Sequence, residues 1–531
     1  MTVATSPLRV VTICARSACL GLLLSFASCG TESSDAAASS SATPQEPVQE
    51  TVGRGVLVVA IDALRADHLP AGGYDRGTMP AVTQLNEREG FTFTNVWSPG
   101  PGVVPAHLAL LTGCDPSVGR QPSLPMENGS VAAPLFNWII PPDVPRLAEE
   151  FLAHGWMTGG FVDHPSIAGL RGFRQGFRDF ADAGGAIGDQ SQNGERRIFG
   201  FEGVALRFVE WIKELDRDRD WFAYLHMNDL ERLWSTDLSG LDRKFKKRPG
   251  YDLVPPAAAG QDVFFAVPRS RFGAGQSSIG EYLGLYDSAM SQLDKKLIRL
   301  FGVLQTQRRW QDTTIVIVGS YGLGFGEGGM IMTSGTLCPV DLHVPLLIRP
   351  APSLGLAVGS SFDELASLLD LAPTLLDMHG LSVREGMHGQ SLAPWMRAEV
   401  SEPREQDYLF ASHGIYAGFA VTDGSWLLQV AEPGSRGPGA LSSSWFGDNS
   451  SHRSEQHEVL YDLSVELPPG KMSHGVQDPV RAAAMRAAGV EWFEWMTSLQ
   501  RVVHQPTFGG ADVDAAELRA LRERGLLGSM D

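Results

Sequence analysis

Apolar positions along the chain fall into two patterns that alternate. The run GVLVVAID, which starts at Gly55, is unbroken and rich in β-branched residues, as is typical of a strand buried on both faces of a sheet. Segments 144–154 and 201–215 have a helical pattern, and each leads into a strand-like run, MTGGFV and WFAYLHM. This alternation predicts a largely parallel sheet covered by helices.

The strongest amphipathic helix is predicted over residues 281–305, and a strand over 314–319 follows it. Beyond Pro394 the pattern changes to short strand-like runs separated by turn-rich spacers. These runs are residues 408–411, 416–421, 426–431 and 458–463. Asp478 and Pro479 then provide an N-cap and a first-turn proline for a Trp-rich helix that ends near Leu499. We therefore expect a second, smaller antiparallel sheet with one helix.

Composition and charge exclude several classes of protein. The chain has 531 residues, of which 43% are hydrophobic and 20% charged, as in ordinary globular proteins. The net charge of −18 disfavours attraction to polyanions, so we expect no nucleic-acid partner. One basic run, DRKFKKR over residues 242–248, is either a solvated face or a site for a sulfated or phosphorylated polymer.

The N-terminal segment is typical of a secreted bacterial lipoprotein. Arg9 and Arg16 precede a short apolar run over 18–27, which is too short to span a bilayer. The following FASCG resembles a lipobox, in which Cys29 would be lipidated, although an ordinary secretory signal is the alternative. Residues 30–53 are too polar to fold and form a predicted tether. We expect a protein held in the bacterial cell envelope, outside the cytoplasm, with the membrane as its partner through Cys29.

The remaining cysteines give no metal or disulfide framework. None of the five lies in a CxxC pair or in a Cys/His cluster with zinc spacing. Whether Cys114 and Cys338 pair is left open by the sequence.

Several segments occur in an order that resembles the sulfatase family of the alkaline phosphatase superfamily. They are VLVVAIDALRADHL, FTNVWSPGPGVVPAHLALLTG, DWFAYLHMND, TTIVIVGSYGLGFGEGG, HVPLLIRP and EVLYDL. The resemblance implies an α/β fold with a large mixed central sheet between helix layers and a small C-terminal antiparallel sheet with a helix. The expected divisions are a signal peptide over 1–28, a tether over 29–53, a sulfatase-like domain over 54–396 and a C-terminal subdomain over 397–531.

The resemblance also implies a divalent cation, usually calcium, and a nucleophile. The first loop of the family supplies acidic ligands, and here Asp62 occupies one position while Ala63 occupies the next. Asp62 is either a retained metal ligand or a cap for the following turn. The nucleophile position is Val103, which has neither a hydroxyl nor a thiol, so covalent catalysis by the family route is excluded there.

Other family positions are also replaced. Ala106 stands in place of the serine of the nucleophile motif, whereas His107 is retained at its basic position. Ser320 and Tyr321 replace the second pair of metal ligands, and His343 is the best remaining anion contact by the resemblance. The predicted vestigial pocket comprises Asp62, His107, Asp229, Ser320, Tyr321 and His343.

These replacements leave two hypotheses. The first is a pseudosulfatase that binds no metal cofactor and has lost catalysis, with a sulfated or phosphorylated molecule as its ligand. The second is an active sulfuric- or phosphoric-ester hydrolase with a rebuilt metal site. The residues that could rebuild it are Asp67, His107, Asp229, Glu231 and Ser320. Three or more ligand atoms converging near Asp62 would favour the second hypothesis.

Overall fold

The structure is a computed structural model, and its described residues all belong to one compact unit, Glu50–Asp531. They are residues 52–119, 139–167, 171–182, 200–234, 241–251, 278–325, 327, 337–400, 404, 407–412, 418–431, 458–465 and 477–503. The predicted signal segment and Cys29 lie outside them. Within the described residues, no helix combines the length and the apolar character needed to span a bilayer.

Nine strands form the large sheet in the order β4-β3-β5-β1-β6-β7-β2-β8, with β9 beside β2. They are β1 (Gly55–Ile61), β2 (Phe91–Trp97), β3 (Met157–Val162), β4 (Asp179–Asp182), β5 (Trp221–Met227), β6 (Thr313–Gly319), β7 (His343–Arg349), β8 (Ser360–Phe362) and β9 (Ala366–Ser367). Strand β7 runs antiparallel to β6 and β2, whereas β1 is parallel to both of its neighbours. Every residue of β1 is buried, as its unbroken apolar run predicts. The expected mixed sheet is confirmed.

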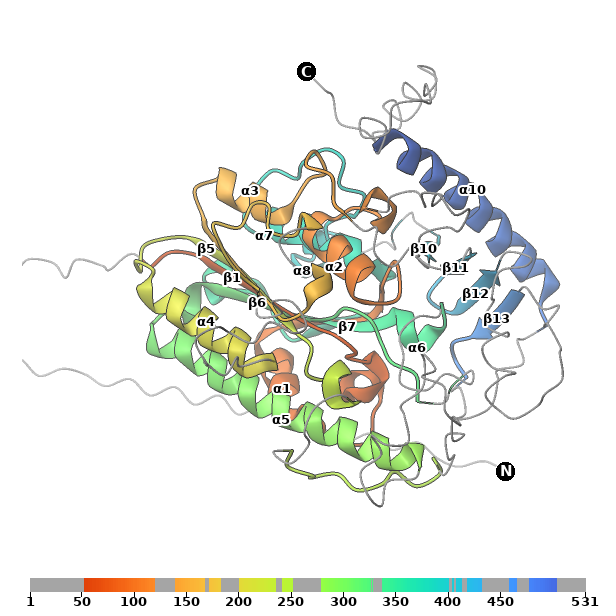
Figure 1. The fold of residues 1–531 in the computed structure, drawn as a ribbon, viewed down its shortest axis with the longest axis horizontal. Coiled ribbons are helices and arrows are strands. Elements are labelled where there is room, and N and C mark those ends of the chain that lie inside the picture. The colour runs from red at the N-terminus through yellow and green to blue at the C-terminus, as the bar shows by residue number, and fades with distance from the viewer. Residues whose placement is uncertain are drawn as a thin grey trace, which may run out of the picture. The chain divides into compact units, whose positions relative to one another are not determined.

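Helices cover both faces of this sheet (Figure 1). One face carries α1 (Pro80–Glu89), α4 (Gly200–Glu214) and α5 (Ile279–Thr306). The other carries α2 (Val103–Thr112), α3 (Leu147–Ala153), α7 (Leu371–Met378) and α8 (Ala393–Met396). The amphipathic helix predicted over 281–305 is α5, and one stripe of it is buried from Tyr282 to Leu304.

Helix α3 is shorter than the sequence predicts. It begins at Leu147 instead of residue 144, because Pro145 disfavours the helical conformation at Val144 and Arg146 is extended. The Arg146 guanidinium donates hydrogen bonds to the carbonyls of Val144 and Ile140 at 2.5 and 3.1 Å, which holds this turn in place.

The small antiparallel sheet has the order β10-β11-β12-β13. Its strands are β10 (Leu409–Ser412), β11 (Gly418–Thr422), β12 (Trp426–Ala431) and β13 (Glu458–Asp462). Helix α10 (Pro479–Val503) lies along the outside of this sheet in Figure 1, where Met485 packs against Phe419. Apolar side chains of the sheet, including Tyr461, share a second buried cluster with Trp97 of β2 and with Leu342 of α6 (Pro339–Leu342). The two sheets are therefore joined by packing. Cys114 and Cys338 are buried free thiols and form no disulfide.

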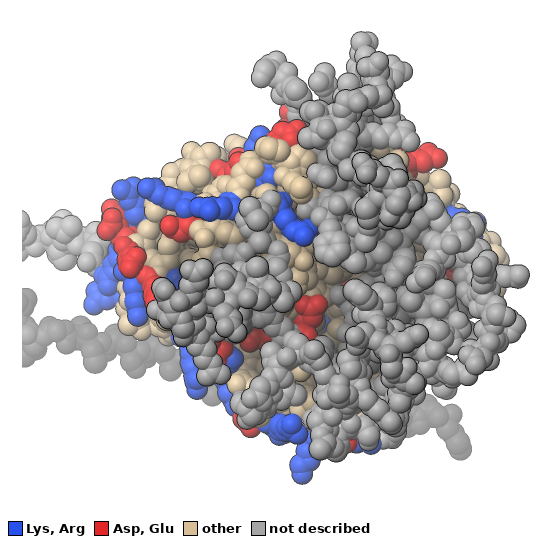
Figure 2. All heavy atoms as spheres, in the orientation of Figure 1, with Lys and Arg blue, Asp and Glu red and all other residues tan. Residues whose placement is uncertain are grey.

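The basic run 242–248 lies along α5. Lys244 donates to the carbonyl of Gly77 at 3.2 Å, and Arg248 pairs with Asp75 at 2.7 Å, so part of its charge is used within the molecule. On the face shown in Figure 2, basic and acidic side chains are interspersed over the described surface. The segment can lie this close to α5 because residue 284 is a glycine. A Cβ at this position would come within 2.7 Å of the Lys246 carbonyl oxygen.

Two glycines of α5 should respond oppositely to alanine. Gly284→Ala should lower the free energy of unfolding by about 1–3 kcal/mol, because the new methyl group meets backbone that cannot move aside cheaply. Gly302→Ala, on the same helix but with open space around it, should raise that free energy by about 1 kcal/mol. Urea unfolding of both variants measures the difference. A shift in the same direction for both would contradict the close packing of residues 242–248 on α5.

Candidate functional site

The site is built where parallel strands end at one edge of the large sheet. Asp62 directly follows β1, and the register pairs Ala60 with His226 on β5 and Ile61 with Gly319 on β6. Ser320 follows β6 immediately. The carboxyl ends of neighbouring parallel strands thus bring these side chains together, as is common for sites in α/β proteins.

Asp62 is fully buried and accepts three side-chain hydrogen bonds. Nε2 of His107 lies 2.9 Å from Oδ1, and Nε2 of His226 lies 2.7 Å from Oδ2. The Ser320 hydroxyl donates to Oδ1 at 2.5 Å. Burial alone would raise the pKa of Asp62, but the His226 and His107 rings and their hydrogen bonds hold it well below its usual range. Asp62 is therefore an ionised carboxylate inside the protein.

The hydrogen-bond partners of the two rings determine where their protons lie. The backbone N–H of Asp163 donates to Nδ1 of His226 at 3.2 Å, so the proton of this ring is on Nε2 and points at Asp62. Nδ1 of His107 lies 2.5 Å from the Tyr224 hydroxyl. Burial lowers the pKa of His107 and raises that of Tyr224 well above its ordinary value, so the neutral ring accepts from the tyrosine and donates to Asp62. Each ring therefore donates from Nε2 to the same carboxylate.

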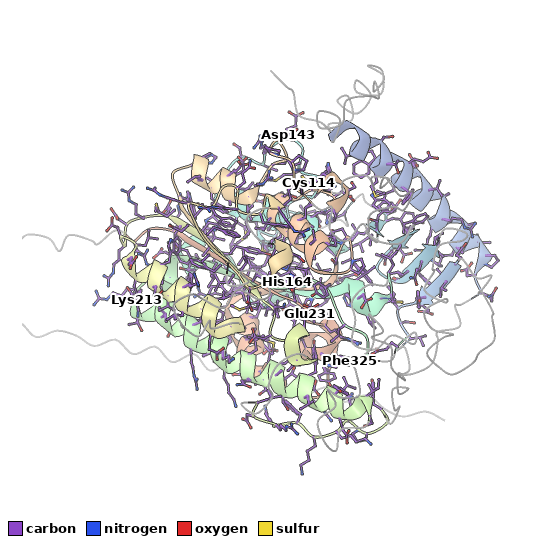
Figure 3. The ribbon with its side chains drawn as sticks, viewed as in Figure 1. Cys114, Asp143, His164, Lys213, Glu231 and Phe325 are labelled. Atoms are coloured by element: carbon purple, nitrogen blue, oxygen red, sulfur yellow. The ribbon has the colours of Figure 1, made fainter. Side chains whose placement is uncertain are left out.

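Two more ionisable groups lie beside this carboxylate. Glu231 begins a short 3-10 helix, Glu231–Trp234, and is labelled near the centre of Figure 3. Burial and the nearby charge of Asp62 raise the pKa of Glu231 to about 7. Tyr321 is fully buried, and burial, Asp62 and Glu231 raise its pKa well above the ordinary value.

The family's nucleophile position is the first residue of α2. Val103 is partly buried there and packs against the main core, and His107 follows one turn later on the same helix. Ala63, at the second ligand position, keeps a left-handed backbone with a φ of 59°. Its carbonyl accepts a hydrogen bond from the buried Tyr286 hydroxyl at 2.6 Å, which ties this turn to α5.

The structure brings together four of the six residues of the predicted vestigial pocket, and it adds Glu231. Asp62, His107, Ser320 and Tyr321 form one buried cluster. Asp229 and His343 make other contacts.

Asp229 accepts the backbone N–H of Phe201 at 2.8 Å at the start of α4, which is a capping role. Nε2 of His343 donates to the Thr94 carbonyl at 2.7 Å, and burial lowers the pKa of this ring. A neutral His343 ring has one N–H group, and that group already donates to the Thr94 carbonyl. The ring therefore has no donor left for an anion.

Tyr224 and His226 were not identified from the sequence. Both lie in the strand-like run WFAYLHM, where they read as parts of an apolar strand. Their spacing was the one signal that could have identified them. Residues two apart on a strand point to the same face, and these two lie near the end of the strand, beside the edge that carries Asp62.

One carboxylate oxygen of Asp62 and one ring nitrogen from each of His107 and His226 lie within 4.8 Å of one another. This is a nitrogen-rich set and differs from the six to eight oxygen ligands of calcium, so a family-type calcium ion does not fit. For a transition metal, His226 would have to present a free Nε2 lone pair, whereas the Asp163 N–H keeps the ring proton there. The geometry favours a hydrogen-bonded cluster over a metal centre.

Breaking this cluster should destabilise the fold. Asp62→Ala leaves the buried Nε2 donors of His107 and His226 without an acceptor, and we expect a loss of about 3–5 kcal/mol in the free energy of unfolding. Ser320→Ala should cost about 1 kcal/mol. The control Asp75→Ala, an exposed ion pair with Arg248, should cost less than about 1 kcal/mol. Chemical denaturation tests this order, and an Asp62→Ala protein as stable as the parent would contradict a structural role.

Glu231 should make stability fall with rising pH. Its pKa of about 7 in the folded chain exceeds the ordinary value near 4.5, so the folded protein binds more protons between these pH values. Stability conferred by the protonated form is therefore lost as pH rises through 7, by roughly 1–3 kcal/mol. Glu231→Gln should flatten this slope, and Glu214→Gln, on the exposed side of α4, should not. Equal slopes for the parent and Glu231→Gln would refute the assignment.

Comparison with known sequences identifies the family. The model of the sulfatase family matches residues 54–381, which is more than half of the chain. The choline-sulfatase of Rhizobium meliloti (strain 1021) is 29% identical over 174 residues, 31% of this chain and 32% of that protein. The chain spans only 11% to 32% of the length of such curated relatives.

Solved structures share the fold at low identity. A putative sulfatase from Bacteroides thetaiotaomicron VPI-5482 has a TM-score of 0.60 at 18% identity, covering 87% of this chain and 96% of its own. The phosphonate monoester hydrolase of Silicibacter pomeroyi has a TM-score of 0.58 at 16% identity, covering 84% and 95%. With the family model matched across both Asp62 and Val103, the chain belongs to the sulfatase family.

Proposed function

We propose that this protein is a non-catalytic member of the sulfatase family, a pseudosulfatase whose role is binding. The observation that carries the proposal is the Asp62 cluster. The carboxylate that would hold the family's cation accepts fixed hydrogen bonds from His107, His226 and Ser320. Val103 provides no nucleophile beside it.

The charge of the site supports the same conclusion. Transfer of a sulfuryl or phosphoryl group needs positive charge where the departing group gains electrons. Here Asp62 is ionised, and each of its two ring partners already donates from Nε2 to one of its oxygens. A sulfate ester at this position would meet a negative charge without a compensating cation among the described hydrogen-bond partners of Asp62.

One observation favours the alternative, an ester hydrolase with a rebuilt metal site. Asp62, His107 and His226 present three potential ligand atoms within 4.8 Å of one another. A metal there would need a different tautomer or orientation of His226. Its substrates would then be esters of the kinds named for similar proteins, a choline sulfate or a phosphonate monoester.

Metal content and turnover distinguish the two proposals. We expect the protein, dialysed against a weak chelator, to carry no stoichiometric calcium, manganese or zinc by elemental analysis. It should hydrolyse aryl sulfate, aryl phosphate and aryl phosphonate esters no faster than heat-denatured protein. His107→Gln and the exposed control His154→Gln should match the parent in both assays. One metal per chain, with turnover that His107→Gln removes and His154→Gln keeps, would establish the rebuilt site instead.

We also propose that Cys29 carries a lipid that anchors the domain in the cell envelope. The short apolar run before it and the polar segment after it support this. Cys29→Ala should move the protein from the membrane fraction to the soluble fraction and remove the lipid mass. Identical fractionation of the two proteins, with no lipid on either, would reject the anchor.

A further inference from the structure

A cavity of about 870 Å³ opens between the loops of the large sheet and the small sheet. Its described lining comes from the turn after β1, the end of β2, the start of β7, the β11–β12 turn and the end of β13. Neither Asp62 nor Val103 lines it. The open cavity is thus separate from the buried cluster described above, and its volume suits a ligand of about disaccharide size.

The deepest cation of the cavity is already neutralised. Arg65 is almost fully buried and pairs with Asp67 at 2.5 Å and with Glu327 at 2.9 Å. Two hydrogen bonds run to Asp67 and one to Glu327, and a fourth runs to the Leu323 carbonyl at 2.9 Å. The guanidinium is therefore committed to protein acceptors, and the cluster of Arg65, Asp67 and Glu327 keeps one net negative charge.

Asp67 is the member of this cluster that meets the cavity. Its side chain is 52% exposed, although it sits in a recess of the protein. Arg65 takes one acceptor site on each of its oxygens, and a carboxylate offers about four such sites. The recess would raise the pKa of Asp67, but Arg65 holds it well below its usual range, so Asp67 is ionised and has acceptor capacity to spare.

The walls add more negative charge. Arg248 is paired with Asp75 at the rim, at 2.7 Å. Asp363 and Asp462 also line the cavity. Over the described lining, five carboxylates face two guanidinium groups. The neutral His343 ring, stacked on Trp97 with centroids 4.9 Å apart, adds no positive charge.

We infer that this cavity binds an ammonium-bearing ligand of about disaccharide size, with Asp67 as its counter-ion. A sulfated or phosphorylated ligand, as expected from the family resemblance, would meet excess carboxylates and a buried guanidinium that already donates four of its five N–H groups to protein acceptors. A protonated amine can instead donate to the open acceptor sites of Asp67. The inference goes beyond the proposed loss of catalysis and does not depend on it.

Three forms of one saccharide test the charge preference. Isothermal titration of the intact protein uses the glucosamine disaccharide with free amines, its N-acetylated form and its N-sulfated form, at mildly acidic pH, where the amines are protonated and Asp67 stays ionised. We expect the free amine to bind at least about tenfold more tightly than the acetylated form, which corresponds to 1.4 kcal/mol. The sulfated form should bind weakest.

Three variants then test whether Asp67 binds the ammonium group. Asp67→Asn should weaken binding of the free amine by about tenfold and leave that of the acetylated form unchanged. Glu87→Gln, which removes an exposed carboxylate on α1 outside the cavity, should change neither. Asp363→Asn is a second cavity variant that leaves the Arg65 ion pairs intact. It should weaken binding of the free amine by a smaller factor than Asp67→Asn does.

Three results would overturn the inference. They are equal binding of the free and acetylated forms, tightest binding of the sulfated form, and no binding of any form. If the Asp67→Asn protein fails to fold, Asp363→Asn is the deciding variant. An affinity of Asp363→Asn for the free amine equal to that of the parent would also contradict binding in this cavity. Because no arm measures turnover or metal content, failure here leaves the proposed pseudosulfatase function standing.

Discussion

An ionised carboxylate buried at the end of a central strand must be surrounded by hydrogen-bond donors, and the site of this protein follows from that constraint. Asp62 has no access to water, so an unpaired charge there would cost several kcal/mol. A metal ion could compensate it in a catalytic sulfatase. Here the compensation comes from His107, His226 and Ser320, which occupy both carboxylate oxygens. Their hydrogen bonds favour a structural role for the position over a catalytic one.

The same turn carries a second buried charge of opposite sign. Arg65, three residues after Asp62, is compensated by the carboxylates of Asp67 and Glu327, which are charged partners. Hydrogen bonds from His107, His226 and Ser320 satisfy the anion, and two carboxylates satisfy the cation, so the Arg65 group keeps one net negative charge. This difference explains why one fold can retain the architecture of an anion-processing family and still present a cavity that disfavours anions.

The sequence predicted the framework well because its signals are local. The unbroken apolar run of β1 and the periodic stripe of α5 each identify an element without knowledge of its neighbours. Val103 is the first residue of α2, and its lack of a hydroxyl or thiol is read from residue type alone. Helix α3 was misjudged by three residues, since the periodic pattern was given more weight than Pro145.

The site was predicted only in part, because its grouping depends on packing between distant segments. Asp229 was placed in the pocket by its family position, yet its carboxylate caps α4, a contact that depends on where residue 201 lies in space. Tyr224 and His226 were overlooked because alternation along β5 decides which residues face Asp62, and register between strands is not visible in one strand alone.

Contacts to backbone atoms hold the turn that carries Asp62 and Ala63. Ala63 remains left-handed at a φ of 59°, a conformation that costs an ordinary residue about 1–2 kcal/mol. The hydrogen bond from Tyr286 to its carbonyl and the close approach of Gly319 to the Leu64 carbonyl hold the turn there. Since these contacts involve backbone atoms, replacing an acidic side chain by alanine removes a ligand without releasing the turn. The conformation of this turn therefore does not depend on which side chain residue 63 carries.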